Sequence, residues 1–194
     1  WIRPVSSRNN GAIVSDQCRL YDGAIPQPLD VVQVPLTTKE SQGIQPENWF
    51  IDDSQNWKKL ARWDATIAER LVEKPRDIWL EDQVPCDRVT VGFLSTRKPL
   101  QSLYLIRPQA CRLCIVDEEY DGKTTQRKRA VFNYNDNTYV LGMTDPFAAS
   151  KYFGDAEVTD NVSVSIDRCL LCISYAKEEY YGYHYKVVAG VIEL

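Results

Sequence analysis

Strand-like runs rich in branched and aromatic residues dominate residues 102–194, and a single helix signal interrupts them. That signal is Thr144-Asp145-Pro146, which combines a capping residue, an early acid and an early proline, and it predicts a short helix over residues 146–153. The strand-like runs cover residues 102–107, 112–116, 127–134 and 138–143 before the helix, and residues 169–175 and 183–192 after it.

Pro108 separates the first two runs and bends the chain between them. We therefore expect these runs to form one long, bent strand, so that the order becomes three strands, a helix and two strands. This is the order of an OB-fold barrel, in which the helix lies between the third and fourth strands. The sequence thus predicts a five-stranded OB-fold barrel over residues 102–194.

The N-terminal half is less regular, although residues 29–36 alternate as a strand does. After Asp52-Asp53-Ser54, apolar residues recur at roughly helical spacing (Trp57, Leu60, Trp63 and Ile67), which predicts a helical insertion around residues 54–72. Ile-Arg-Pro occurs at residues 2–4 and again at 106–108, a spacing that suits two barrels of about a hundred residues each. The predicted fold is mainly β, with a first OB-like barrel over residues 1–101 and a second over 102–194.

Composition limits the classes of function. The chain has 194 residues, a formal net charge of −4 and no apolar stretch long enough to span a bilayer. Its one His and six Cys leave few candidates for a metal centre or a nucleophile, and the six Cys are too few for a disulfide scaffold of this size. We expect a cytoplasmic, non-catalytic protein that needs no cofactor and does not associate with membranes.

A basic cluster followed by aromatic residues lies on the predicted second and third strands of the C-terminal barrel. Its members are Lys123, Arg127, Lys128, Arg129, Phe132, Tyr134 and Tyr139. OB barrels bind single strands by stacking bases on aromatic rings while basic residues follow the phosphates. Because side chains alternate along a strand, Arg127 and Arg129 share one face, and Lys128 lies on the other face with Phe132 and Tyr134. A solvated edge strand protected by its charge is the alternative interpretation.

The two loops expected to rim this barrel are acidic and rich in tyrosine, at residues 117–121 and 178–183. Carboxylates there would repel a phosphate chain unless Lys123 and Lys177 offset the charge. Tyrosine is common in the centre of protein interfaces. The candidate contacts for a protein partner are Tyr120, Glu178, Glu179, Tyr180, Tyr181 and Tyr183. Ordinary polar loops with buried tyrosine rings would also explain the pattern.

Two Cys-x-x-Cys pairs, Cys111 with Cys114 and Cys169 with Cys172, could supply four thiolates to a structural zinc ion. The residues between each pair are characteristic of strand interiors, where positions i and i+3 point to opposite faces. We therefore predict no metal site, and we interpret these cysteines as small buried hydrophobic residues.

Several segments, in a consistent order over essentially the whole chain, resemble the bacterial dual OB-fold domain family. They are Trp1-Ile2-Arg3-Pro4-Val5-Ser6, Ile51-Asp52-Asp53, residues 102–108, Thr144-Asp145-Pro146, Leu171-Cys172-Ile173-Ser174 and residues 182–189. The resemblance implies two OB barrels and a nucleic-acid-binding role, often in bacterial defence or conflict systems, with no established catalytic residues. In the family pattern further strand sequence precedes the Trp-Ile-Arg-Pro-Val segment, so we expect the first barrel to lack its opening strands.

The leading functional prediction is a non-catalytic module that binds single-stranded DNA or RNA through the strand face of the second barrel. The alternative is a protein-interaction subunit of a larger defence or toxin-type assembly, which would bind its partner through the acidic, tyrosine-rich loops. An enzyme is the least favoured class, because the acids near Lys58 fit no catalytic spacing.

Overall fold

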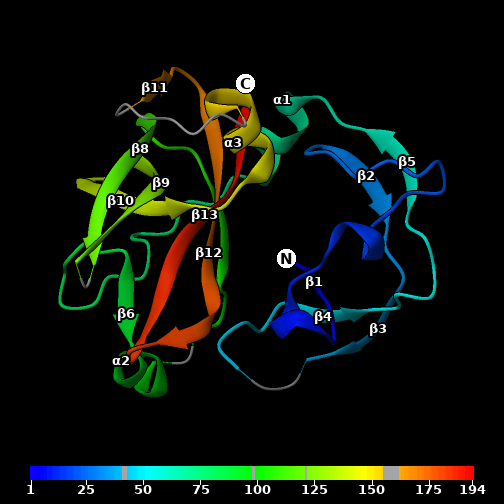
Figure 1. Ribbon diagram of the computed structural model, residues 1–194, viewed down its shortest axis with the longest axis horizontal. Coiled ribbons are helices and arrows are strands. Elements are labelled where there is room, and N and C mark those ends of the chain that lie inside the picture. The colour runs from blue at the N-terminus through cyan, green and yellow to red at the C-terminus, as the bar shows by residue number, and fades with distance from the viewer. Residues whose placement is uncertain (41–42, 98, 121, 155–161) are drawn as a thin grey trace.

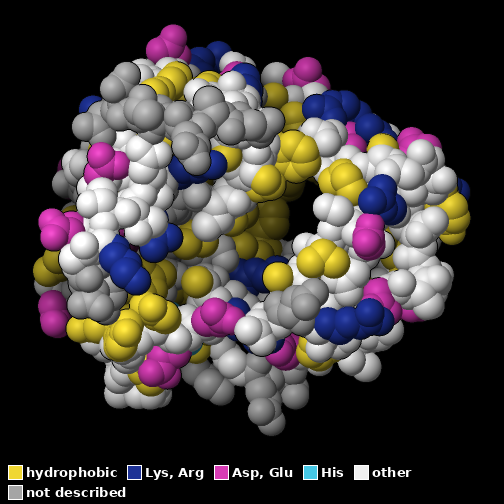
Figure 2. Space-filling view, viewed as in Figure 1, with side chains coloured by type: hydrophobic (Ala, Val, Ile, Leu, Met, Phe, Trp, Pro, Cys, Tyr) yellow, Lys and Arg dark blue, Asp and Glu magenta, His cyan; other side chains and the backbone are white. Residues whose placement is uncertain are grey.

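The computed structural model describes residues 1–40, 43–97, 99–120, 122–154 and 162–194, apart from the side chains of Asn9 and Tyr120. Figure 1 shows the C-terminal strands gathered on one side of the molecule and the N-terminal strands on the other. Figure 2 shows a hollow between the two sides, with hydrophobic side chains on its wall.

The C-terminal sheet consists of long strands joined by tight turns. In hydrogen-bonded order it contains β11 (Ser163–Ile166), β8 (Ala110–Tyr120), β9 (Lys123–Tyr134), β10 (Asn137–Met143), β13 (Tyr183–Glu193), β12 (Cys169–Tyr180) and β7 (Leu103–Ile106). A short strand, β6 (Arg88–Thr90), also pairs with β13. Neighbouring strands are antiparallel, except that β10 and β13 are parallel. Residues before position 102 therefore belong to this sheet.

This strand order is that of an OB fold. Pro108 lies between β7 and β8, which are the two halves of one bent strand: β8 pairs with β9, and β7 pairs with β12. The helix α3 (Pro146–Phe153) lies between β10 and β12, and the Asp145 carboxylate caps it by accepting hydrogen bonds from the N–H groups of Phe147 and Ala148. The predicted mainly β fold, the bent first strand and the helix position are confirmed.

Side chains along these strands point alternately to the two faces of the sheet, and those on the inner face form the principal core. Inward-facing residues of β8, β9 and β10, such as Leu113, Phe132 and Leu141, are almost fully buried, and they pack with Ile173 of β12 and Val188 of β13. The residues between them along each strand point outward. The same alternation therefore decides which side chains are available to a ligand.

The N-terminal strands form two small sheets. One contains β1 (Arg3–Val5), β4 (Asn48–Ile51) and β3 (Leu36–Lys39), with β1 parallel to β4, and the other pairs β2 (Asp30–Gln33) with β5 (Lys58–Arg62). Short 3-10 turns occupy Asn9–Gly11 and Ser15–Gln17. Leu20, Ile51 and Trp57 form a small core of their own.

The predicted helical insertion around residues 54–72 is largely wrong. Residues 58–62 form β5, and helix is confined to α1 (Ala65–Ala68) and a 3-10 turn at Glu69–Leu71. Tertiary pairing overrides the helical spacing, because Asp30 of β2 forms ion pairs with Lys59 and Arg62 of β5 at 2.7 and 2.9 Å. The expected apolar stripe also fails, since Leu60 is 57% exposed. Asp52 closes a turn with Ser54, and Asp64 is the residue that caps a helix.

A polar seam joins the N-terminal sheet to β7 and β12. The Arg3 guanidinium donates to the side chains of Asn48, Ser102 and Ser174 at 2.8–3.1 Å, and its burial lowers the pKa of Arg3. The side chain of Gln45 donates to the carbonyl of Tyr175 at 2.8 Å. Buried polar groups that satisfy one another in this way fix how the two parts pack.

The connection from the first part to the second packs against the core of the C-terminal sheet. Ile78 is fully buried in the principal core, and the ring of Trp79 stacks on Tyr104 and Tyr175 at centroid distances of 4.7 and 4.2 Å. Lys186 of β13 is fully buried under this segment and donates to the carbonyls of Ile78 and Trp79. The chain then forms β6 and the short helix α2 (Val91–Thr96).

In the part of the chain that the structure describes, no helix combines the length and the apolar character needed to cross a membrane.

Candidate nucleic-acid interface

Strand register places a set of basic and aromatic residues on one continuous outer face of the C-terminal sheet. Arg129 of β9 lies opposite Gly142 of β10, which lies opposite Val187 of β13. Tyr185 is two residues from Val187 along β13 and so shares its face, and it lies opposite Arg88 of β6. We use the name outer face for Lys123, Arg127 and Arg129 of β9, Arg88 of β6, and Tyr183 and Tyr185 of β13.

Arg129 joins the strands beneath this face. Its guanidinium contacts Glu118 of β8 at 2.5 Å and Asp87, next to β6, at 3.2 Å. Opposite Arg129 stands Gly142, where the space for a Cβ would lie 3.8 Å from a guanidinium nitrogen. A Cβ at position 142 would therefore meet the Arg129 guanidinium at ordinary van der Waals distance. Both carboxylates neutralise Arg129, so it organises the face rather than offering it a free charge.

Arg88 and two tyrosines form the aromatic part of the outer face. The Arg88 guanidinium lies 5.0 Å from the ring centroid of Tyr183 and 5.6 Å from that of Tyr185. It also donates to the Tyr185 hydroxyl at 3.0 Å, and this hydrogen bond raises the pKa of Arg88. The Arg88 side chain remains 47% exposed. A cation held over these half-buried rings suits both phosphates and bases.

The β8–β9 hairpin has one basic face and one acidic face. Lys123 and Arg127 are exposed on the same face as Arg129, and the described residues offer neither of them a salt-bridge partner. Among the described side chains, Glu118 is the only carboxylate on that face of β8, and it forms an ion pair with Arg129. Lys128 faces the other way, on the side that carries Asp117 and Glu119. Figure 2 shows Lys and Arg side chains beside hydrophobic ones over the region where Figure 1 places β9 and β6.

The three aromatic rings predicted to stack on bases are not accessible. Phe132 and Tyr139 are 1% and 0% exposed and stack on each other, and Tyr134 is 6% exposed. The hydroxyls of the two tyrosines form hydrogen bonds inside the protein: Tyr134 donates to the carbonyl of Pro75, and Tyr139 accepts from the N–H of Ile78. The stacking role predicted for these residues is therefore wrong, because the β9 face that carries them forms the barrel core.

A family model described as the dual OB-containing domain matches residues 1–191. The chain belongs to the dual OB-containing domain family. The resemblance noted in the sequence is thereby confirmed. No curated protein and no solved structure gave a match.

In this dual OB chain, the residues predicted to bind a protein partner lie around the β12–β13 hairpin. Tyr180 and Tyr181 are 57% and 72% exposed, with their rings edge to face at 4.6 Å. Tyr181 and Gly182 have φ angles of 51° and 81°, as a two-residue hairpin turn of the primed type requires. Glu178 accepts a hydrogen bond from the Asn10 side chain, Glu179 is exposed, and Tyr183 belongs to the outer face. The side chain of Tyr120, and Asp121 beside it, lie outside the described residues.

The two Cys pairs of the dual OB chain separate in space. Cys111 and Cys169 are buried in the principal core and hydrogen-bond to each other, which together with burial raises the pKa of Cys169. Cys172 lies on the opposite side of β12, where burial raises its pKa to about 11. Within the described residues, no three His, Cys, Asp or Glu side chains gather where a metal ion could be held.

Sequence reasoning missed Arg88 and Tyr185. Arg88 lies in a segment whose short strand pairs with β13, far away in the sequence. Tyr185 carried a usable signal, because it alternates with Tyr183 on a predicted strand and therefore shares its face.

Proposed function

We propose that this dual OB chain is a nucleic-acid-binding module that holds a single strand against the outer face. The observation that carries the proposal is the joint exposure of Arg88 over two tyrosine rings and of Lys123 and Arg127 on one side of the sheet. Phosphates would lie along the arginines and lysine, and bases would contact the tyrosine rings. A role in bacterial defence or conflict is part of this proposal, and a cytoplasmic location stays a prediction.

The outer face differs from the predicted binding site, because its aromatic residues are Tyr183 and Tyr185. The charges on this face are compatible with nucleic-acid binding although the chain as a whole has an acidic net charge. Glu118 and Asp87 are already paired with Arg129, so they do not repel a phosphate as free carboxylates would. Asp117 and Glu119 of the β8–β9 hairpin have no salt-bridge partner among the described residues, and they lie on the opposite face. Arg88 also pairs with Asp87 at 3.9 Å, so Lys123 and Arg127 are the outer-face cations that a nucleic acid would meet without a salt-bridge partner in the described part of the chain.

The test is a salt titration of binding to fluorescently labelled oligothymidylate and oligouridylate. We expect affinity to fall steeply with salt, and the Arg88→Ala, Arg127→Ala double variant to reduce the slope of log K against log salt by roughly 0.7 for each charge removed. Lys128→Ala is the matched control, because this lysine belongs to the same strand but faces the other way. An equal loss in Lys128→Ala would place binding elsewhere, and no binding at low salt would refute the proposal.

A protein partner is the second candidate function, and the exposed Tyr180–Tyr181 pair favours it. Two large rings at a hairpin tip offer apolar area at little cost in conformational entropy. A co-purification experiment with wild type and a Tyr180→Ser, Tyr181→Ser variant tests it. A specific partner lost only in the variant would support this function, and an unchanged set of partners would count against it.

A further inference from the structure

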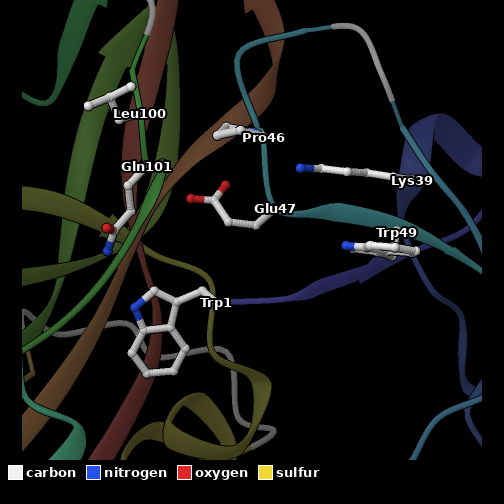
Figure 3. A pocket seen from close by; sticks show the side chains of 7 residues that line it. All are labelled: Trp1, Lys39, Pro46, Glu47, Trp49, Leu100 and Gln101. Carbon is white, nitrogen blue, oxygen red and sulfur yellow. The ribbon is translucent and has the colours of Figure 1, made fainter.

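A small pocket lies at the seam between the N-terminal sheet and the approach to β7 (Figure 3). Its volume is about 240 Å³. Lys39 of β3 and Trp49 of β4 form one wall, and they are register partners on adjacent strands. Leu100 stands on the opposite wall, Trp1 borders the opening, and Glu47 lies between the two walls.

The pocket contains one cation, on Lys39, and one indole N–H, on Trp49. Figure 3 shows the Lys39 ammonium and the Trp49 ring nitrogen pointing into the pocket, toward the side of Glu47 and Pro46. Among the described residues, neither the Lys39 ammonium nor the Trp49 Nε1 has a hydrogen-bond or ion-pair partner. The Glu47 carboxylate is 7% exposed, accepts two hydrogen bonds from Ser102 and lies close to the Arg3 guanidinium, whose positive charge offsets it.

The Trp1 ring at the opening is held in place by a contact outside the pocket. The indole N–H of Trp1 donates to Glu73 at 2.5 Å, and the side chain of Trp1 remains half exposed. Glu73 also accepts hydrogen bonds from Gln101 and from the backbone of Leu105. The ring is therefore oriented in advance, which lowers the entropic cost of stacking a ligand on it.

Size and charge together select the class of occupant. Pockets for drug-sized ligands occupy about 300–1,000 Å³, so this one fits a single planar group rather than a whole cofactor. Indole rings stack on any base, and an unpaired ammonium beside them suits the adjoining phosphate. A cationic occupant is disfavoured because Lys39 would repel it.

We infer that this pocket takes one unpaired base of a single strand, with the neighbouring phosphate on Lys39. The inference rests on the proposed nucleic-acid function and adds a second contact on the N-terminal part of the chain. A bound oligonucleotide would then contact both parts of the molecule, at the pocket and at the outer face. An oligonucleotide long enough to reach both contacts should therefore bind more tightly than one that reaches only one of them.

The experiment titrates wild type, Lys39→Ala and Trp1→Ala with oligothymidylate and follows tryptophan fluorescence and affinity. Base stacking quenches the fluorescence of the ring it covers. We expect each variant to bind roughly five- to tenfold more weakly, and Trp1→Ala to show less quenching at saturation. Lys58→Ala and Trp63→Ala are matched controls, since both residues lie in or beside β5, away from the pocket. Circular dichroism of each variant confirms folding.

The outcomes separate this inference from the proposed function. If the Arg88→Ala, Arg127→Ala variant binds weakly while Lys39→Ala and Trp1→Ala bind like wild type, the pocket inference is overturned and the outer face stands. If only the pocket variants lose affinity, the pocket stands and the outer face is refuted. An acidic peptide that binds wild type but not Lys39→Ala, with oligothymidylate binding unchanged in that variant, would assign the pocket to a protein and overturn the inference.

Discussion

The carboxylate of Glu47 accepts two hydrogen bonds from Ser102, one from its backbone N–H and one from its hydroxyl, each at 2.6 Å. Glu47 belongs to the N-terminal part, next to β4, and Ser102 precedes β7 of the C-terminal sheet. Both residues are buried, and Arg3 lies close to the same carboxylate. The two parts of the molecule are thus joined by a charged group that is largely buried.

Removing this carboxylate should destabilise the protein strongly. Glu47→Ala leaves Arg3 buried without its counter-charge and the Ser102 N–H without an acceptor, at a cost of about 3 kcal/mol. Ser102→Ala keeps the backbone N–H bond to Glu47 and removes the hydroxyl, which donates to Glu47 and accepts from Arg3, so it should cost less, about 1–2 kcal/mol. Urea denaturation measures both. Glu119→Ala, at an exposed site, should stay within about 0.5 kcal/mol of wild type, and equal effects at Glu47 and Glu119 would contradict the assigned role.

Arg127 and Arg129 should respond oppositely in stability and binding. Arg129→Ala removes the ion pairs of Arg129 with Asp87 and Glu118 on a half-buried face and should cost about 2 kcal/mol of unfolding free energy. Arg127→Ala should leave stability unchanged, because the side chain is exposed, and should weaken oligonucleotide binding. Thermal melts read alongside the binding assay separate the two effects. Comparable melting temperatures for both variants would show that Arg129 does not hold the strands together.

Tyr139→Phe should affect folding and not binding. The hydroxyl accepts the Ile78 N–H at 3.2 Å in a fully buried site, so its loss leaves that donor unsatisfied at a cost of about 1–2 kcal/mol. Oligonucleotide affinity, measured under conditions where the variant is folded, should match wild type. A selective loss of affinity would mean that the barrel interior opens to the ligand.

Lys186 should make stability depend on pH in the alkaline range. Burial lowers the pKa of Lys186 in the folded protein, whereas the unfolded chain keeps a value near 10.5. Between those two pKa values the unfolded state binds the extra proton, so stability rises with pH toward the unfolded value. Lys186→Met should remove this rise and remain folded. Urea melts of both proteins from pH 7 to 10 isolate the contribution, and parallel pH profiles would contradict it.

The buried cysteines should resist alkylation in the native protein. Burial raises the pKa of Cys172 to about 11, and the hydrogen bond with Cys111 together with burial raises that of Cys169. At pH 8 both should remain thiols, and iodoacetamide should modify them only after unfolding. Peptide mass spectrometry with and without denaturant makes the comparison. Native labelling of Cys169 would show that the core around it opens.

Local signals determined much of the C-terminal half. The proline at 108, the capping Asp145 and Pro146 at the start of α3, and the alternation along β9 act over a few residues, so they can be recognised in one sequence. Alternation also separated Arg127 and Arg129 from Lys128 correctly. It could not tell which face is the interior, because that depends on how β9 curves with its neighbours. Phe132, Tyr134 and Tyr139 were therefore placed on a binding surface when they form the core.

The sequence by itself determined a mainly β chain with the strand and helix order of an OB fold, because hydrophobic period, turn residues and helix caps are local properties. Only the tertiary structure decided that residues 58–62 are a strand, that β6 pairs with β13, and that Arg88 meets Tyr183 and Tyr185. These features depend on contacts between residues far apart in the chain. Hydrogen bonds and ion pairs across such distances can outweigh the weak local preference for a helix or a loop.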